Sequence, residues 1–292
     1  MIFPYMRILR PKHWIKNGFV IAPLIFSLNF NQESFVQCLV AVIAFCCASS
    51  FVYVLNDLVD RNRDRMHPEK RNRPIAAGEI SITGAIFICG LLAAVITIIC
   101  IRLGIQEIVV IVSYIILNLA YSFILKHIIL LDVMAIALGF VLRIVAGAFA
   151  VEVEVSHWMV LCTFFLSLFL GFSKRKKEIE SLGKTEQRSV LKQYDESQLN
   201  LLIAISVSLT IVTYSLYTFD DKVVEQFGSG ALIYTVPIVV YGVLRYLVIV
   251  FQQNKGEDVA ELVLKDIGII LTVIVFLVVI AVVAVTSSNF LL

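Results

Sequence analysis

Long apolar segments dominate this sequence. A helix that crosses a hydrocarbon core of about 30 Å needs roughly 20 mostly apolar residues. Charged and polar clusters divide the chain into nine apolar segments, of which the first is short. We expect membrane spans at residues 17–28, 35–55, 80–101, 108–124, 129–150, 157–173, 199–219, 231–251 and 267–285. With 60% hydrophobic and only 16% charged residues, a water-soluble class is excluded. The sequence predicts an all-α integral membrane protein with nine transmembrane helices in a single transmembrane domain, residues 1–292.

The distribution of lysine and arginine predicts the orientation of these spans. Short cytoplasmic loops carry an excess of the two residues. If the N-terminus is cytoplasmic, twenty-one of the 24 lysines and arginines lie on the inner side. We therefore expect a multi-pass protein of the cell (inner) membrane with the N-terminus inside, the C-terminus outside and its polar clusters facing the cytoplasm. Polar groups on one side argue against a channel or transporter. The basic runs follow the membrane pattern, so nucleic-acid binding is not expected.

Four polar residues follow the second apolar segment at helical spacing. At 100° per residue, Asn56, Asp57, Asp60 and Asp64 fall within an arc of about 100°, so an amide and three carboxylates share one face of a helix. These carboxylates would repel one another without a cation. Mg²⁺ prefers hard oxygen ligands and often bridges to substrate phosphates. The pattern predicts a magnesium site that binds a diphosphate.

A basic stretch with two prolines, residues 67–74, follows the acidic face. Arg71 and Arg73 are candidates to hold phosphate oxygens through their forked donors. Anchoring at the inner membrane surface explains any single arginine equally well. The acids, in turn, have a simpler interpretation as a solvated helix end that pairs with nearby arginines, namely Arg61, Arg63 and Arg65.

The spacing NDxxDxxxD, after a second span and before the basic stretch, resembles the first signature of the UbiA superfamily of intramembrane prenyltransferases. Asn56, Asp57, Asp60 and Asp64 match it at each position. The resemblance implies a bundle of nine helices around a central cavity. It also implies polar cytoplasmic loops that hold a diphosphate through Mg²⁺.

Typical members of that family carry a second aspartate-rich motif after the sixth helix, and this sequence departs from that pattern. Residues 174–178 read KRKKE instead. Lys174, Arg175 and Glu178 repeat the spacing of the first three motif residues 118 positions later, with the charge inverted. A cationic face with one acid is expected to bind an additional anion directly.

This substitution, with the stretches at residues 10–17 and 139–143, resembles the decaprenyl-phosphate phosphoribosyltransferase branch of the superfamily. The resemblance implies Mg²⁺-dependent transfer of 5-phosphoribose from phosphoribosyl diphosphate to a polyprenyl phosphate, with release of diphosphate, for cell wall biosynthesis. Such substrates carry more negative charge than one metal site neutralises, which agrees with the second, cationic face. The alternatives are a UbiA-type polyprenyltransferase that acts on an aromatic acceptor, and a membrane protein without catalysis.

The expected site residues fall into three sets. The catalytic set is Asp57, Asp60, Lys174, Arg175 and Glu178. The metal set is Asn56, Asp57, Asp60 and Asp64. The substrate-binding set is Lys16, Asn56, Arg71, Arg73, Tyr121 and Lys126.

Three further expectations concern single residues and assembly. Tyr121 has an equally good interpretation as an aromatic residue of the membrane interface. We expect Asp132, just inside the fifth span, to pair with Lys126 or with a site arginine. The length of the isoprenoid and the oligomeric state are not determined by the sequence, which is compatible with a homo-oligomer.

Overall fold

The computed structural model describes residues 2–66, 70–181, 190–252 and 265–288. Within these ranges every regular element is helical, so the all-α prediction is confirmed. The chain divides into two compact units. Unit 1 comprises Met1–Lys126 and Leu142–Glu154, and unit 2 comprises His127–Val141 and Val155–Leu292. One helix, α6 (Leu131–Ala150), contributes residues to both units.

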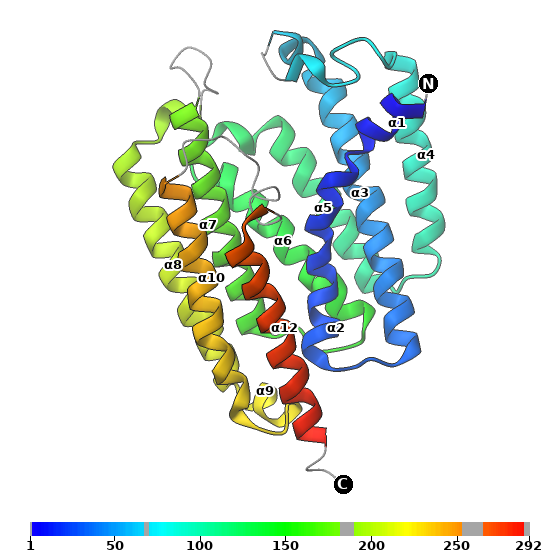
Figure 1. Cartoon of the computed structure of the whole chain (residues 1–292). Helices are drawn as coiled ribbons and strands as arrows, with labels where there is room; N and C mark the ends of the chain where they lie inside the picture. The colour runs from blue at the N-terminus through cyan, green and yellow to red at the C-terminus, as the bar shows by residue number, and fades with distance from the viewer. Residues whose placement is uncertain (1, 67–69, 182–189, 253–264, 289–292) are drawn as a thin grey trace. The chain divides into compact units, whose positions relative to one another are not determined.

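The helices of unit 1 pack around the long helix α3 (Figure 1). They are α1 (Ile2–Leu9), η1 (Pro11–Ile21), α2 (Ala22–Ser27), α3 (Gln32–Arg65), η2 (Lys70–Asn72), α4 (Ile82–Cys100) and α5 (Ile105–Phe123). The 3₁₀ turn η3 (Leu125–His127) follows, and its last residue belongs to unit 2. Phe45 of α3 is fully buried and meets the ring of Tyr114 of α5 at 5.2 Å between centroids.

In unit 2, α7 packs against α8 and α10 packs against α12 (Figure 1). Its elements after α6 are α7 (His157–Ser181), η4 (Leu191–Gln193), α8 (Glu196–Phe219), α9 (Asp221–Gln226), η5 (Gly230–Thr235), α10 (Val236–Gln252) and α12 (Ile267–Ser288). The core includes Phe169 and Tyr246, whose rings meet edge to face at 5.2 Å.

Eight helical segments within the described ranges are long and apolar enough to cross a membrane, and they match the second to ninth predicted spans. The first predicted span, residues 17–28, is not a single helix. Its residues form the end of the 3₁₀ helix η1 and the short helix α2, which run beside α3 (Figure 1). Pro23 contributes to the boundary, because it has no N–H to continue the ladder and is tolerated in the first turn of α2.

The helical stretch from Pro11 to Ser27 begins before the predicted span and is longer than it. A 3₁₀ helix rises about 2.0 Å per residue and an α-helix about 1.5 Å. The 11 residues of η1 and the 6 residues of α2 therefore extend over about 31 Å if they are collinear. That length is comparable to a hydrocarbon core, so nine crossings stay a prediction.

The helix α3 continues beyond its apolar part. The predicted span ends at residue 55, whereas the 34-residue helix runs to Arg65, about 51 Å from its start. Its apolar part and its charged last turns cannot both fit within a core of about 30 Å. The four motif residues therefore lie on the last turns of a continuous helix, as the spacing predicts.

A close helix contact in unit 1 gives a first testable prediction. A Cβ added to Gly147 of α6 would lie 2.0 Å from the carbonyl oxygen of Val20 and 2.9 Å from its carbonyl carbon. Because a backbone group cannot move aside cheaply, we expect Gly147→Ala to lower the free energy of unfolding by about 1–3 kcal/mol. Thermal unfolding of the detergent-solubilised protein measures the effect.

Gly90 of α4 provides the matched control. An added Cβ at Gly90 meets nothing within 4 Å. Since alanine favours a helix over glycine by about 1 kcal/mol, Gly90→Ala should leave stability unchanged or raise it slightly. Equal thermal stability of the two variants would contradict the close contact at Gly147.

Candidate active site

The acidic motif lies on the last three turns of α3, in unit 1. Asp57 and Asp64 are buried, with 2% and 3% of their surface exposed. Asn56 and Asp60 are half-buried. Burial of two carboxylates at the end of a helix is costly unless cations or donors compensate for the lost water.

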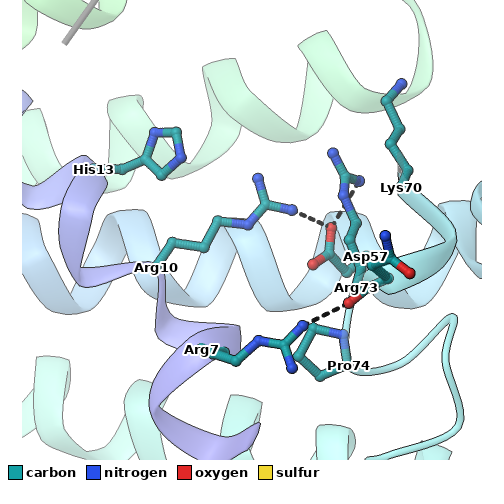
Figure 2. Close-up of a pocket in the computed structure, with 8 residues that line it drawn as sticks. Arg7, Arg10, His13, Asp57, Lys70, Arg73 and Pro74 are labelled. Carbon is teal, nitrogen blue, oxygen red and sulfur yellow. Dashed lines mark hydrogen bonds and ion pairs between the residues drawn. The ribbon is translucent and has the colours of Figure 1, made fainter. Parts of the chain in front are cut away.

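Two arginines compensate the buried carboxylates. Nη2 of Arg10 donates to Oδ1 of Asp57 at 2.5 Å, and Nη1 of Arg73 donates to the same oxygen at 3.0 Å. Nη1 of Arg73 also donates to Oδ2 of Asp64 at 2.7 Å. Figure 2 shows the guanidinium groups of Arg10 and Arg73 converging on Asp57. Arg73 thus bridges two acids that are two turns apart on α3.

Lys126 provides the cation for the third carboxylate. Its Nζ lies 3.2 Å from Oδ1 and 2.9 Å from Oδ2 of Asp60. The structure therefore brings together five predicted site residues within unit 1, namely Asp57, Asp60, Asp64, Arg73 and Lys126. Each of the three motif carboxylates has a cationic side chain as its partner.

The arrangement suits a metal ion whose coordination shell is completed by the substrate. Across the ranges that the structure describes, no three acidic, histidine or cysteine side chains gather closely enough to hold an ion by themselves. Mg²⁺ commonly uses only one or two carboxylates, with waters and substrate phosphates as its other ligands. Oδ2 of Asp57 is buried and has no hydrogen-bond partner among the described residues. A buried carboxylate oxygen of this kind fits a divalent cation.

The N-terminal segment supplies residues that the sequence analysis did not select. Arg10, which directly precedes η1, adopts a left-handed backbone conformation with φ 53°. Its guanidinium group lies 5.0 Å from the ring centroid of Tyr53 and reaches Asp57. In the sequence, the stretch 10–17 indicates only a resemblance to the phosphoribosyltransferase branch. An arginine before a proline, on a segment with further cations, was the available signal.

A cavity of about 390 Å³ lies beside Asp57 in unit 1. It is lined by Arg7, Arg10, His13, Asp57, Lys70, Asn72, Arg73 and Pro74. Figure 2 shows these side chains contributed by the N-terminal segment, by α3 and by the segment that follows it. Basic groups predominate in the lining.

The basic cluster of unit 2 is organised around Arg175 of α7. This arginine is buried, with 3% of its side-chain surface exposed. Its Nε donates to Oδ2 of Asp132 at 2.7 Å, and its Nη1 donates to Oε2 of Glu178 at 2.6 Å. The expectation that Asp132 pairs with a site arginine is confirmed. Glu178 holds Arg175 from the same helix, one turn away.

Tyr194 completes this cluster and was missed by the sequence analysis. Its hydroxyl donates to Oδ1 of Asp132 at 2.7 Å and accepts the backbone N–H of Leu130 at 2.9 Å. Burial raises the pKa of the Tyr194 phenol well above its ordinary value, and the bond to Asp132 raises it further. The phenol therefore remains a donor at neutral pH.

The other predicted residues occupy the following places. Lys174 is half-buried on α7, next to Arg175. Lys16 is half-buried on η1, Tyr121 is half-buried near the end of α5, and Arg71 is exposed on η2. The structure thus assembles Lys174, Arg175 and Glu178 within unit 2 and the acidic motif with its cations within unit 1.

Comparison with known proteins gives agreement in sequence and in fold. Residues 19–262 match the model of the UbiA prenyltransferase family. The chain is 33% identical over 274 residues to a decaprenyl-phosphate phosphoribosyltransferase of Mycolicibacterium smegmatis. The matched region covers 89% of this chain and 86% of that relative. A protein of the same name from Corynebacterium glutamicum is 34% identical over 274 residues, covering 89% and 80%.

A solved structure supports the fold independently. The structure of a UbiA homolog from Archaeoglobus fulgidus bound to GPP and Mg²⁺ superposes with a TM-score of 0.73. The match covers 96% of this chain and 99% of that one, at 18% sequence identity. The prediction of a transferase is confirmed by the relatives, and the chain belongs to the UbiA prenyltransferase family.

Proposed function

We propose that this chain transfers 5-phosphoribose from phosphoribosyl diphosphate to a polyprenyl phosphate and releases diphosphate, with Mg²⁺ as cofactor. The observation that carries the proposal is the buried, doubly paired Arg175 on α7, in a segment where a carboxylate motif would have bound a second metal. Relatives of 33% and 34% identity that carry the name of this activity support it.

The acidic face of α3 would hold the metal. Asn56, Asp57, Asp60 and Asp64 offer hard oxygen ligands on one side of the helix. These residues would hold a Mg²⁺ ion, which would supply positive charge to stabilise the leaving diphosphate.

The cations of unit 1 have a second role in this proposal. Arg73 and Lys126 neutralise the carboxylates in the structure. Each side chain has further N–H donors besides those that contact the carboxylates, so both can also donate to phosphate oxygens. Lys16, Arg71 and Tyr121 are further candidates for contacts with substrate.

The chemical step needs positioning more than proton transfer. An oxygen of the lipid phosphate attacks the anomeric carbon of the ribose, and the bond from that carbon to the diphosphate oxygen breaks. A phosphate monoester is already ionised near neutral pH, so no general base is required. Lys174 and Arg175 would hold a phosphate, and Glu178 and Asp132 fix the orientation of Arg175.

The proposal includes a location. The lysine and arginine distribution supports an inner-membrane protein with nine crossings, the N-terminus and the active site on the cytoplasmic side and the C-terminus outside. In it the whole chain acts as one catalytic domain.

Two substrate pairs test the proposed function. Purified protein is incubated with labelled phosphoribosyl diphosphate and a polyprenyl phosphate, or with a prenyl diphosphate and an aromatic acid, each with Mg²⁺ or with EDTA. We expect lipid-linked phosphoribose only from the first pair and only with Mg²⁺. Prenylation of the aromatic acid would instead identify a UbiA-type polyprenyltransferase, and equal product with EDTA would contradict the metal.

A further inference from the structure

The cavity beside Asp57 has a lining suited to an anion. Four of its lining residues carry a positive charge, namely Arg7, Arg10, Lys70 and Arg73, and one, Asp57, carries a negative charge. Glu79 pairs with Arg7 at 3.1 Å and Asp64 pairs with Arg73 at 2.7 Å, both from outside the lining. Even with these acids included, the charge around the cavity is net positive.

Asp57 orients the two arginine side chains but neutralises only part of their positive charge. Arg10 and Arg73 both donate to one of its oxygens, Oδ1, so one negative charge fixes two guanidinium groups. Each guanidinium group has five N–H donors, and the contacts to Asp57 use one from each. Figure 2 shows both guanidinium groups meeting at the carboxylate of Asp57, with Lys70 and His13 drawn on either side of them.

The backbone at Arg10 indicates that this placement is specific. A left-handed conformation costs a residue other than glycine, asparagine or aspartate roughly 1–2 kcal/mol. Arg10 adopts it with φ 53° and ψ 58°, and its side chain then reaches Asp57 across 47 residues of sequence. Arg10 directly follows the end of α1, where a left-handed residue commonly ends a helix, and its contact with Asp57 helps to hold it there.

We propose that this cavity is a binding site for a phosphate monoester, held directly by Arg10, Lys70 and Arg73 without a metal. The identity of its natural ligand rests on the proposed function. Either the 5-phosphate of the phosphoribosyl donor or the phosphate of the lipid acceptor has this chemistry. The cavity shares Asp57 with the metal set, and the unpartnered Oδ2 of Asp57 remains for the cation. One carboxylate thereby serves a metal through one oxygen and the phosphate-binding arginines through the other.

Two soluble probes test the cavity without metal and without turnover. Equilibrium binding of labelled ribose 5-phosphate and of farnesyl phosphate is measured in EDTA for the wild-type protein, Arg10→Gln and Lys70→Gln. We expect each substitution to weaken binding of one probe about tenfold or more, because a hydrogen bond to a charged group is lost. Loss confined to ribose 5-phosphate assigns the cavity to the donor, and loss confined to farnesyl phosphate assigns it to the acceptor.

Lys12→Gln is the matched control. Lys12 belongs to the same segment as Arg10, is exposed and does not line the cavity. It should bind both probes like the wild-type protein, which separates the site from general attraction of anions to the basic N-terminus. Thermal unfolding of all variants shows whether Arg10→Gln loses its fold, and Lys70→Gln tests the cavity independently of the contact to Asp57.

Failure of the cavity and failure of the proposed function give different results. If neither Arg10→Gln nor Lys70→Gln alters the binding of either probe or the KM of either substrate, while the wild-type protein transfers phosphoribose, the cavity proposal is overturned and the proposed function stands. If the protein transfers no phosphoribose but the variants lose a probe, the monoester site stands without that reaction. Equal weakening by Lys12→Gln also overturns the site.

Discussion

Replacing Asp60 with asparagine is expected to lower kcat/KM for phosphoribosyl transfer by about 10³-fold at saturating Mg²⁺, a loss of about 4 kcal/mol of transition-state stabilisation. Asparagine keeps the size of the side chain and one carbonyl oxygen but removes the negative charge. In the proposed function that charge would help to hold the cation that neutralises the leaving diphosphate. The rate of diphosphate release, measured over a range of Mg²⁺ concentrations, tests the prediction.

The control for Asp60 removes the same charge from a similar ion pair. Oδ2 of Asp266 lies 2.9 Å from Nη2 of Arg245, the same distance as Oδ2 of Asp60 from Nζ of Lys126. Asp266→Asn should leave kcat/KM within about twofold, because Asp266 belongs to none of the expected site sets and pairs with Arg245 in unit 2. Near-normal transfer by Asp60→Asn at saturating Mg²⁺ would refute the metal role of Asp60.

The long apolar helices and the acidic face could be predicted from local sequence. Runs of apolar residues specify membrane spans because no other regular structure satisfies the backbone in lipid so simply. The shared face of Asp57, Asp60 and Asp64 follows from 3.6 residues per turn, and α3 does continue through them. The segment 17–28 was wrong as one helix because a window of apolar residues does not register that Pro23 interrupts the ladder.

The partners of the site residues could not be predicted, because they join elements that are distant in sequence. Lys126 was a candidate partner for Asp132, yet it pairs with Asp60, 66 residues earlier. Asp132 pairs with Arg175, 43 residues later. Pairing of Lys126 with Asp60 or with Asp132 would in each case neutralise a carboxylate, and only the packing of the helices decides which pair forms.

Arg143, a buried arginine within the apolar helix α6, shows the same limit. The sequence predicts that a charge at this depth needs a partner, but not which one. Its Nε donates to Oδ1 of Asn17 at 2.8 Å and its Nη2 donates to the hydroxyl of Tyr114 at 2.9 Å. Asn17 lies in the 3₁₀ helix η1, next to the predicted substrate-binding residue Lys16. The same short helix therefore carries both the neutral partner of Arg143 and a candidate for contact with substrate.

The largest expected loss of stability comes from Asp132→Ala. Asp132 is fully buried and accepts hydrogen bonds from Arg175 and Tyr194. Removing one member of a buried ion pair costs roughly 3–5 kcal/mol, because the remaining charge loses its compensation. We expect the free energy of unfolding, measured by denaturant titration in mixed micelles, to fall by that amount. Tyr194→Phe removes one hydrogen bond and should cost only about 1 kcal/mol.

A second substitution separates loss of charge compensation from loss of packing. In Asp132→Ala combined with Arg175→Met, the uncompensated guanidinium group is gone and an apolar side chain of similar length replaces it. Because replacing a buried ion pair by apolar residues is often neutral or stabilising, the double variant should be more stable than Asp132→Ala alone. A double variant as unstable as the single one would show that packing around Asp132, and not the charge of Arg175, sets the cost.

The same pair of variants distinguishes the structural role of Arg175 from its proposed role in binding phosphate. If Arg175 acts only within the buried cluster, the double variant recovers activity together with stability. If Arg175 also holds a substrate phosphate, stability recovers while KM for one substrate stays at least about tenfold above the wild-type value, the effect of losing a charged hydrogen bond. The single variant Arg175→Lys keeps the positive charge but lacks the forked guanidinium group that reaches Asp132 and Glu178 together. We therefore expect both its stability and its activity to stay well below the wild-type values.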